Sequence, residues 1–153
     1  MIIKIKYHND NKEYNFNSFD EIKNYDKVVY FDCWANELGE LPELPNSLQI
    51  LLFDNNKLTL LRELPNSLQK LWCNNNKLTS IPKLPNSLIE LNCEHNELTS
   101  LLKLPNSLQK LSCKHNQLTS LPELPNSLII LHCSNNQFIK KQKYKYINKI
   151  IYL

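Results

Sequence analysis

The chain has 153 residues, which is enough for one domain of ordinary size and too few for two domains with cores of their own. Hydrophobic residues make up 42% and charged residues 22%, so neither a disordered chain nor an integral membrane protein is indicated. The single glycine, Gly39, excludes the glycine-rich phosphate-binding loops of nucleotide-binding folds. The formal net charge is only +3, and all basic residues except Arg62 are lysines, which weighs against nucleic acid as the partner.

Residues 1–27 are expected to form an amino-terminal cap. The segment from Ile3 to Tyr7 alternates like a strand, and after a polar turn the segment from Tyr14 to Phe16 predicts a second strand, so the two together predict a hairpin. The four residues from Ser18 to Glu21 fit the capping-box pattern and predict a short helix that runs toward Tyr25. This unit is too small for a domain of its own, and we expect it to cover one end of a larger core.

The first residues do not resemble a signal peptide, because Lys4 and Lys6 interrupt their apolar stretch. No segment of the chain approaches the roughly 18 consecutive apolar residues of a membrane-spanning helix. A membrane is therefore not expected as the partner. The sequence favours an intracellular, cytoplasmic protein.

Residues 28–138 contain six repeats of 20 residues. The string LPNSL begins at Leu44, Leu64, Leu84, Leu104 and Leu124, and the same frame of leucine, cysteine and asparagine follows each copy. In the fourth repeat this frame is Leu88, Leu91, Cys93, Asn96 and Leu98. The first repeat, from Val28, keeps the frame but lacks the LPNSL string before it. Self-similarity at a fixed short period predicts a solenoid in which the repeats stack on one another.

The frame L-x-x-L-x-C-x-x-N-x-L, preceded by Leu-Pro-x-Leu-Pro, resembles the short bacterial type of leucine-rich repeat found in secreted effectors of enteric pathogens. Similar repeats occur in proteins of large DNA viruses of amoebae. The resemblance implies an α/β-type, mostly β, right-handed solenoid with short parallel strands on its concave side. It also implies a protein-binding role without enzymatic activity, in the host cytoplasm if the protein is viral.

The residues of each repeat support this architecture independently. Alternation along a strand points Leu71 into the core and its neighbours Lys70 and Trp72 outward. The two prolines of each repeat oppose a helix, so the convex side is expected to be extended and polyproline-like. One asparagine per repeat falls where the strand turns and is expected to bind backbone groups inside the solenoid as a structural ladder. The ladder consists of Asn36, Asn56, Asn76, Asn96, Asn116 and Asn136.

The cysteines recur with the repeat and are interpreted as small core residues, because Phe53 occupies the same slot in one repeat. They are Cys33, Cys73, Cys93, Cys113 and Cys133. The pairs Cys-x-His at 93–95 and 113–115 do not have the spacing of a zinc site. The repeated serines belong to turns and lack a paired histidine. We therefore expect no metal, no cofactor and no catalytic residue, and the chain is not interpreted as an enzyme.

The expected outward face of the sheet carries an apolar group of residues, which we call the aromatic patch. Contiguous apolar and aromatic side chains on a solvated face commonly mark interaction sites. Burial of these residues beneath the amino-terminal cap is the alternative interpretation. The aromatic patch consists of Tyr30, Trp34, Ile50, Leu52 and Trp72.

Residues 139–153 are expected to form a carboxy-terminal cap, either a terminal amphipathic helix or a last extended segment. Their lysines can attract an anionic surface, but a charge run is more often the solvated face of such a cap. These lysines are Lys140, Lys141, Lys143, Lys145 and Lys149. The sequence thus favours a module that binds another protein, with a self-associating structural component (a homo-oligomer) and an anionic-surface binder as alternatives.

Overall fold

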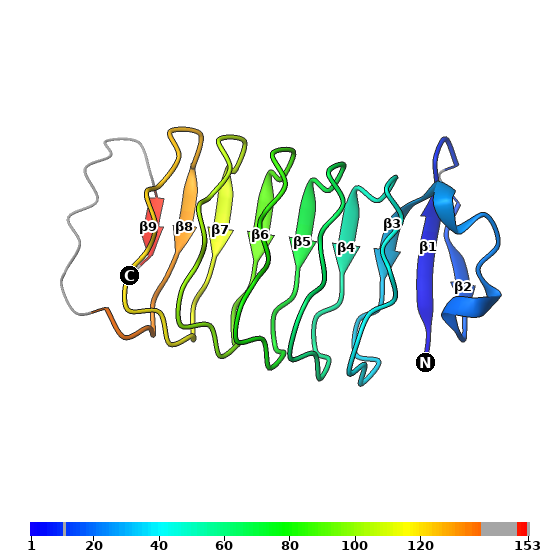
Figure 1. Cartoon of the computed structure of the whole chain (residues 1–153), viewed down its shortest axis with the longest axis horizontal. Helices are drawn as coiled ribbons and strands as arrows, with labels where there is room; N and C mark the ends of the chain where they lie inside the picture. Colours follow the sequence, from blue (N-terminus) through cyan, green and yellow to red (C-terminus); the bar gives the residue numbers. More distant parts are fainter. Residues whose placement is uncertain (11, 139–149, 153) are drawn as a thin grey trace.

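The computed structural model describes residues 1–10, 12–138 and 150–152. In these residues nine strands form one sheet in the order β2-β1-β3-β4-β5-β6-β7-β8-β9, and the coils stack side by side along the long axis (Figure 1). The strands are β1 (Ile3–Tyr7), β2 (Tyr14–Phe16), β3 (Val28–Asp32), β4 (Ile50–Leu52), β5 (Lys70–Trp72), β6 (Glu90–Asn92), β7 (Lys110–Ser112), β8 (Ile130–His132) and β9 (Ile150–Tyr152).

The strands from β3 to β9 are parallel, and their register follows the 20-residue repeat. Leu51 pairs with Leu71, Leu71 with Leu91, and Leu91 with Leu111. Each of these leucines is buried, whereas the residues on either side of it point away from the core. Within the described residues the return segments contain turns and extended chain but no helix. The predicted leucine-rich-repeat solenoid, with parallel strands on one side and extended segments on the other, is confirmed.

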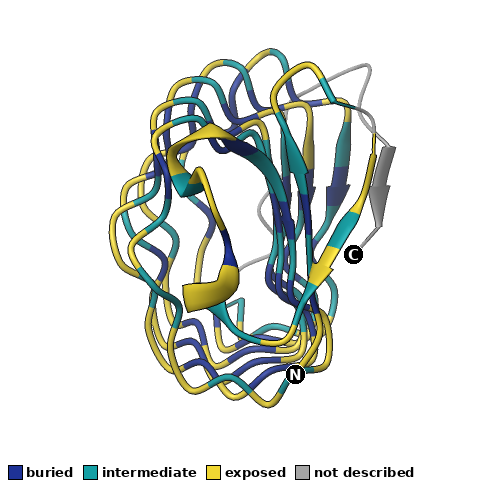
Figure 2. Cartoon of the chain, turned by 90° about the vertical axis from the view of Figure 1, so that its right-hand side faces the viewer, coloured by how far each residue is buried: buried dark blue, intermediate teal, exposed yellow. Residues whose placement is uncertain are grey.

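The core is one continuous column of leucines and cysteines inside the coils. Figure 2 looks along the solenoid from its amino-terminal end and shows the coils stacked behind one another. Phe53 and the five cysteines occupy equivalent positions, and all six side chains are fully buried. The cysteines are unpaired. This slot therefore accepts either a thiol or a phenyl ring, as a packing position does.

One asparagine in each coil bonds to the backbone of two coils. The side-chain Nδ2 of Asn96 donates to the carbonyl oxygens of Cys73 at 2.9 Å, Cys93 at 3.2 Å and Glu94 at 3.1 Å. Its Oδ1 accepts the backbone N–H of Leu78 at 3.0 Å. Asn56, Asn76, Asn116 and Asn136 make equivalent contacts. These side chains satisfy buried backbone groups at the end of each strand, where no sheet partner is available.

The first asparagine of this series bonds to the amino-terminal segment instead of a preceding coil. Asn36 Oδ1 accepts the backbone N–H of Ile2 at 2.7 Å, and its Nδ2 donates to the Ile2 carbonyl at 2.6 Å. Strand β1 itself pairs antiparallel with both β2 and β3. The hairpin therefore closes the end of the solenoid by extending the sheet.

The segment between the hairpin and β3 differs from the short helix expected there. It consists of two 3₁₀ turns, η1 (Phe19–Glu21) and η2 (Tyr25–Lys27), and the Ser18 side chain does not cap the first. Asn24, between the turns, has a left-handed φ of 48°, which interrupts a continuous helix. The Phe19 and Tyr25 rings lie 5.7 and 5.8 Å from the ring of Phe31 and cover the end of the core.

The predicted carboxy-terminal cap, residues 139–153, lies outside the described residues except for β9. The backbone of β9 continues the sheet, because Ile150 pairs in parallel with Ile130 and Tyr152 with His132. A helix long and apolar enough to cross a membrane is not found among the residues that the structure describes.

Candidate functional site

The outward side chains of the sheet form three rows that run across the coils, and together they make up what we call the sheet face. The first row is Tyr30, Ile50, Lys70, Glu90, Lys110 and Ile130. The second row is Asp32, Leu52, Trp72, Asn92, Ser112 and His132. The third row, just beyond the strand ends, is Trp34, Asp54, Asn74, Glu94, Lys114 and Ser134.

Strands β3, β4 and β5 bring four residues of the aromatic patch together. Tyr30 pairs with Ile50, and Leu52 pairs with Trp72, so these side chains are neighbours across parallel strands. All four are half-buried. Trp34 lies in the turn after β3, and 62% of it is exposed. The patch is thus apolar surface on the sheet face.

The amino-terminal hairpin borders the aromatic patch at the edge of the sheet. Lys6 on β1 pairs with Tyr30, and its Nζ lies 5.2 Å from the centre of the Tyr30 ring. The Tyr30 hydroxyl is partly shielded, and burial together with the charge of Asp32 raises its pKa to about 12. Because β1 pairs beside β3 in the same sheet, the hairpin continues the sheet face and leaves Trp34 open.

Trp72 is held in place by its neighbours on the sheet face. The Lys70 Nζ lies 4.0 Å from the centre of the indole ring, and the indole N–H donates to Glu90 Oε1 at 2.8 Å. Lys70 Nζ also lies 3.6 Å from Glu90 Oε2, which closes a triangle of three side chains. One face of the Trp72 ring and its N–H are therefore already occupied within the chain. Trp34 is the most exposed aromatic side chain of the patch.

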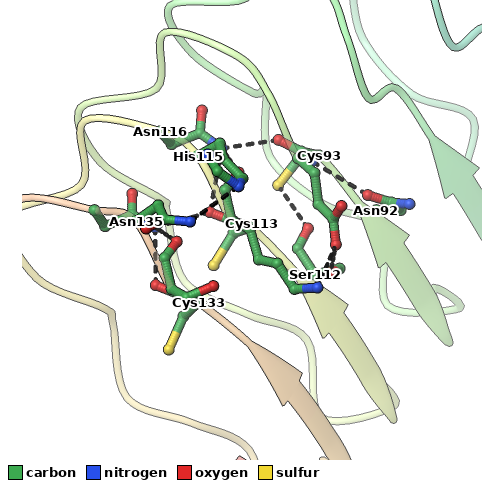
Figure 3. A network of polar contacts seen from close by, with 12 residues as sticks. Asn92, Cys93, Ser112, Cys113, His115, Asn116, Cys133 and Asn135 are labelled. Carbon is green, nitrogen blue, oxygen red and sulfur yellow. Dashed lines mark hydrogen bonds and ion pairs between the residues drawn. The ribbon is translucent and has the colours of Figure 1, made fainter. Parts of the chain in front are cut away.

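The other half of the sheet face is polar apart from Ile130, and some of its charged side chains pair with one another. Lys114 Nζ lies 3.7 Å from Glu94 Oε1, and the Ser112 hydroxyl donates to the same carboxylate. Figure 3 shows this region, with Cys93 Sγ donating to the Ser112 carbonyl at 3.4 Å. A shallow depression of about 240 Å³ lies here between Asn92, Lys110 and His132. Its polar groups are those of a solvated, ion-paired surface.

The geometry separates the residues of the Cys-x-His pairs. Cys93 and Cys113 are fully buried, and burial raises their thiol pKa values well above the usual range. His95 and His115 instead lie on the exposed edge, where their rings stack in parallel with centres 4.1 Å apart. Asn135 Nδ2 lies 2.9 Å from His115 Nε2 (Figure 3). In the described part of the chain, no three histidine, cysteine or acidic side chains come together as a metal site.

The repeated serines have a structural role. The hydroxyl of Ser87, for example, donates to the carbonyl oxygens of Asn66 at 2.7 Å and Leu68 at 2.6 Å. Ser47, Ser67, Ser107 and Ser127 make the corresponding bond to the preceding coil. Each hydroxyl thus joins two coils in the turn that precedes a strand, as the turn interpretation of these serines implies.

Asp54 is a carboxylate that sequence reasoning did not single out. It is only 7% exposed, although it stands on the outward third row, and its Oδ1 accepts the Asn74 backbone N–H at 2.9 Å. Burial is the main cause of its raised pKa, about 6, and the negative charge of Asp32 adds to the effect. The hydrogen bond from Asn74 partly opposes the shift.

We expect Asp54→Asn to stabilise the fold at about pH 8, by on the order of 1 kcal/mol, and to change it little near pH 4. The folded-state pKa of Asp54 lies above the unfolded value, so the wild type loses stability as the pH rises between about 4 and 6. The asparagine keeps the acceptor for Asn74 and removes the charge. Urea denaturation of both proteins at the two pH values checks this. An equal difference in stability between the two proteins at both pH values contradicts this expectation.

Comparisons with known proteins agree with this architecture. The family model described as Leucine Rich Repeat matches residues 67–88. YopM from Yersinia enterocolitica WA-314 is 39% identical with a TM-score of 0.71, and the match covers 74% of this chain and 25% of that one. A leucine-rich effector protein from Yersinia pestis, also YopM, is 44% identical with a TM-score of 0.64, over 67% of this chain and 30% of that one.

The leucine-rich-repeat domain of a Shigella effector is 26% identical with a TM-score of 0.66, and the match covers 80% of each chain. No curated protein matches the sequence. The chain spans only a quarter to a third of the two YopM chains.

Proposed function

Because the chain is a leucine-rich-repeat solenoid that resembles those of enteric effectors, we propose that it is a non-enzymatic module that holds another protein against its sheet face. The observation that carries the proposal is the aromatic patch, which places apolar and aromatic side chains on three adjacent coils of a surface that is otherwise polar except for Ile130.

The two halves of the sheet face are suited to different parts of binding. Exposed aromatic and aliphatic side chains supply most of the binding energy at interfaces, because a partner removes their large apolar surfaces from water. The charged half, with Glu94 and Lys114 paired, contributes orientation and association rate more than affinity. We therefore infer that the partner is anchored on β3, β4 and β5 and steered by the later coils.

The proposal is tested with peptides selected on the full chain from a phage-displayed random library. We expect Leu52→Asp to weaken the selected peptides by at least about tenfold, roughly 1.4 kcal/mol, because it places a charge in the centre of the aromatic patch. Asn92→Asp is the matched control, since Asn92 lies in the same row two coils later, in the polar half. Equal losses for the two variants, or a larger loss for Asn92→Asp, place the site elsewhere.

Self-association through the same surface is distinguished by sedimentation of the full chain. A dimer held together by the aromatic patch dissociates in the Leu52→Asp variant and persists in Asn92→Asp. That result replaces the proposed partner with a second copy of the chain. A monomer at all concentrations, together with Leu52-dependent peptides, supports a different protein as the partner.

A further inference from the structure

Trp34 breaks the pattern of the third row. In every other coil this row carries a polar side chain, from Asp54 to Ser134, whereas Trp34 is an indole that is 62% exposed. The Trp34 side chain contributes little hydrophobic stabilisation to the fold, because most of its apolar surface stays in contact with water. The exposed indole is therefore available to a contact from outside the chain.

Two carboxylates flank Trp34. Asp32 precedes it by two residues, and Asp32 Oδ1 accepts the Trp34 backbone N–H at 3.0 Å. Asp54 takes the place of Trp34 on the next coil, where the Ala35 backbone N–H donates to the Asp54 carbonyl at 3.0 Å. The negative charge of Asp32 raises the pKa of Asp54, and the positive charge of Lys70 lowers it. The indole thus stands between two carboxylates on the sheet face.

Among the residues that the structure describes, neither carboxylate forms an ion pair with a lysine or arginine, although the positive charge of Lys70 acts on Asp54. On the same face, Glu90 Oε2 lies 3.6 Å from the Nζ of Lys70, and Glu94 Oε1 lies 3.7 Å from the Nζ of Lys114. On the hairpin side, Lys4 is the cross-strand partner of Asp32, but its Nζ lies 3.7 Å from Glu13 Oε1. The Nζ of Lys6 lies over the Tyr30 ring. The lysines around the two aspartates are therefore engaged with other groups, and neither Asp32 nor Asp54 forms an ion pair of its own.

The fold does not need these negative charges. Asn92 Oδ1 accepts the Glu94 backbone N–H at 3.2 Å, which is the bond that Asp32 makes to Trp34. Asparagine also replaces aspartate in the third row, where Asn74 follows Asp54 on the next coil. A neutral carboxamide thus serves the same positions elsewhere in the solenoid. A partly buried, unpaired carboxylate is costly, and a cation from outside the chain offsets that cost.

We propose that Trp34, Asp32 and Asp54 form a subsite for the lysine or arginine side chain of a partner segment whose neighbouring apolar residue packs on Ile50 and Leu52. The indole face attracts the cation, and the two carboxylates neutralise it. The subsite rests on the proposed function, because it specifies the chemistry of the partner that the aromatic patch binds. The occupant is thus a basic and apolar segment of another protein.

The test begins with the sequences of the peptides selected from the phage-displayed library. Wild-type protein is expected to enrich peptides with lysine or arginine beside an aliphatic or aromatic residue. The double variant Asp32→Asn, Asp54→Asn is expected to retain apolar peptides without the basic preference. A second double variant, Glu63→Gln with Glu123→Gln, removes the same charge from two exposed positions away from the sheet face and is expected to select like the wild type.

A titration then measures whether the cation and the carboxylates act on each other. One selected peptide is compared with an analogue in which norleucine or citrulline replaces its lysine or arginine. The Asp32→Asn, Asp54→Asn variant should bind the parent peptide about tenfold more weakly and the neutral analogue with unchanged affinity. Trp34→Ala should weaken both peptides, and the parent more.

The outcomes separate the subsite from the proposed function. Peptides that need Leu52 but bind the double aspartate variant as tightly as the wild type overturn the subsite and leave the aromatic patch as a binding surface. A selection that enriches acidic peptides also overturns the subsite. A library from which no Leu52-dependent peptide emerges counts against both.

Discussion

Replacement of Asn96 by alanine is expected to lower the free energy of unfolding by about 3 kcal/mol or more. The substitution removes three donated bonds, to the carbonyl oxygens of Cys73, Cys93 and Glu94, and one accepted from the Leu78 N–H. Each buried backbone group that loses its partner costs about 1 to 3 kcal/mol. Because the bonds to Cys73 and Leu78 join this coil to the preceding one, the change weakens the interface between these two coils.

Asn106→Ala is the matched control for Asn96→Ala. Asn106 is exposed in the turn that precedes β7. We expect its replacement to change stability by less than about 0.5 kcal/mol, as is usual for surface positions. Urea denaturation of the two variants provides the comparison. Equal midpoints would show that the asparagine contacts inside the solenoid contribute no more than a surface side chain.

The sheet follows from the sequence because the repeat specifies its register. Each strand carries one central leucine, and a shift of one residue turns a residue such as Leu91 outward and its charged neighbour Glu90 inward. The fixed period of 20 residues repeats this constraint in every coil. The same reasoning identified the core position of the cysteines, since Phe53 in one coil indicates packing and not ligation.

The amino-terminal cap shows where local pattern fails. The residues after Ser18 fit a capping box, but the segment must cover the Phe31 end of the core, and its rings reach that position from two short turns. Asn24 adopts left-handed backbone between them. A capping box stabilises the start of a continuous helix, and no such helix forms here. The packing of Phe19 and Tyr25 on Phe31 therefore determined the backbone more than the four-residue pattern did.

Alternation also predicts which residues point outward, but not how these side chains meet. It placed Trp72 in the aromatic patch as an anchor and could not show that Lys70 and Glu90 occupy its ring face and N–H, because these contacts depend on rotamers across two coils. It likewise gave no indication that Asp54 is 7% exposed. The burial of an outward side chain depends on the size of its neighbours, and the 20-residue repeat period alone does not specify those sizes.

Replacement of Leu91 by alanine is expected to lower the free energy of unfolding by about 3 kcal/mol, within the range of roughly 2 to 5 kcal/mol for buried leucines. Leu91 is buried between Leu71 and Leu111, which hold the same position on the adjacent strands. The extended backbone on both sides is bound to neighbouring coils by the Asn96 and Ser107 side chains. The coil therefore cannot collapse into the cavity, and the cost of the lost contacts remains.

Leu102→Ala tests the same chemical change without a cavity. Leu102 is 56% exposed, on the return path of the solenoid, so its truncation removes little packing. We expect the urea-denaturation midpoint of the Leu102→Ala variant to stay close to that of the wild type. The Leu91→Ala variant should unfold at a clearly lower urea concentration. If the two variants lose equal stability, the leucine column is not the source of cohesion between coils. The hydrogen bonds of the asparagines and serines would then be the main source of that cohesion.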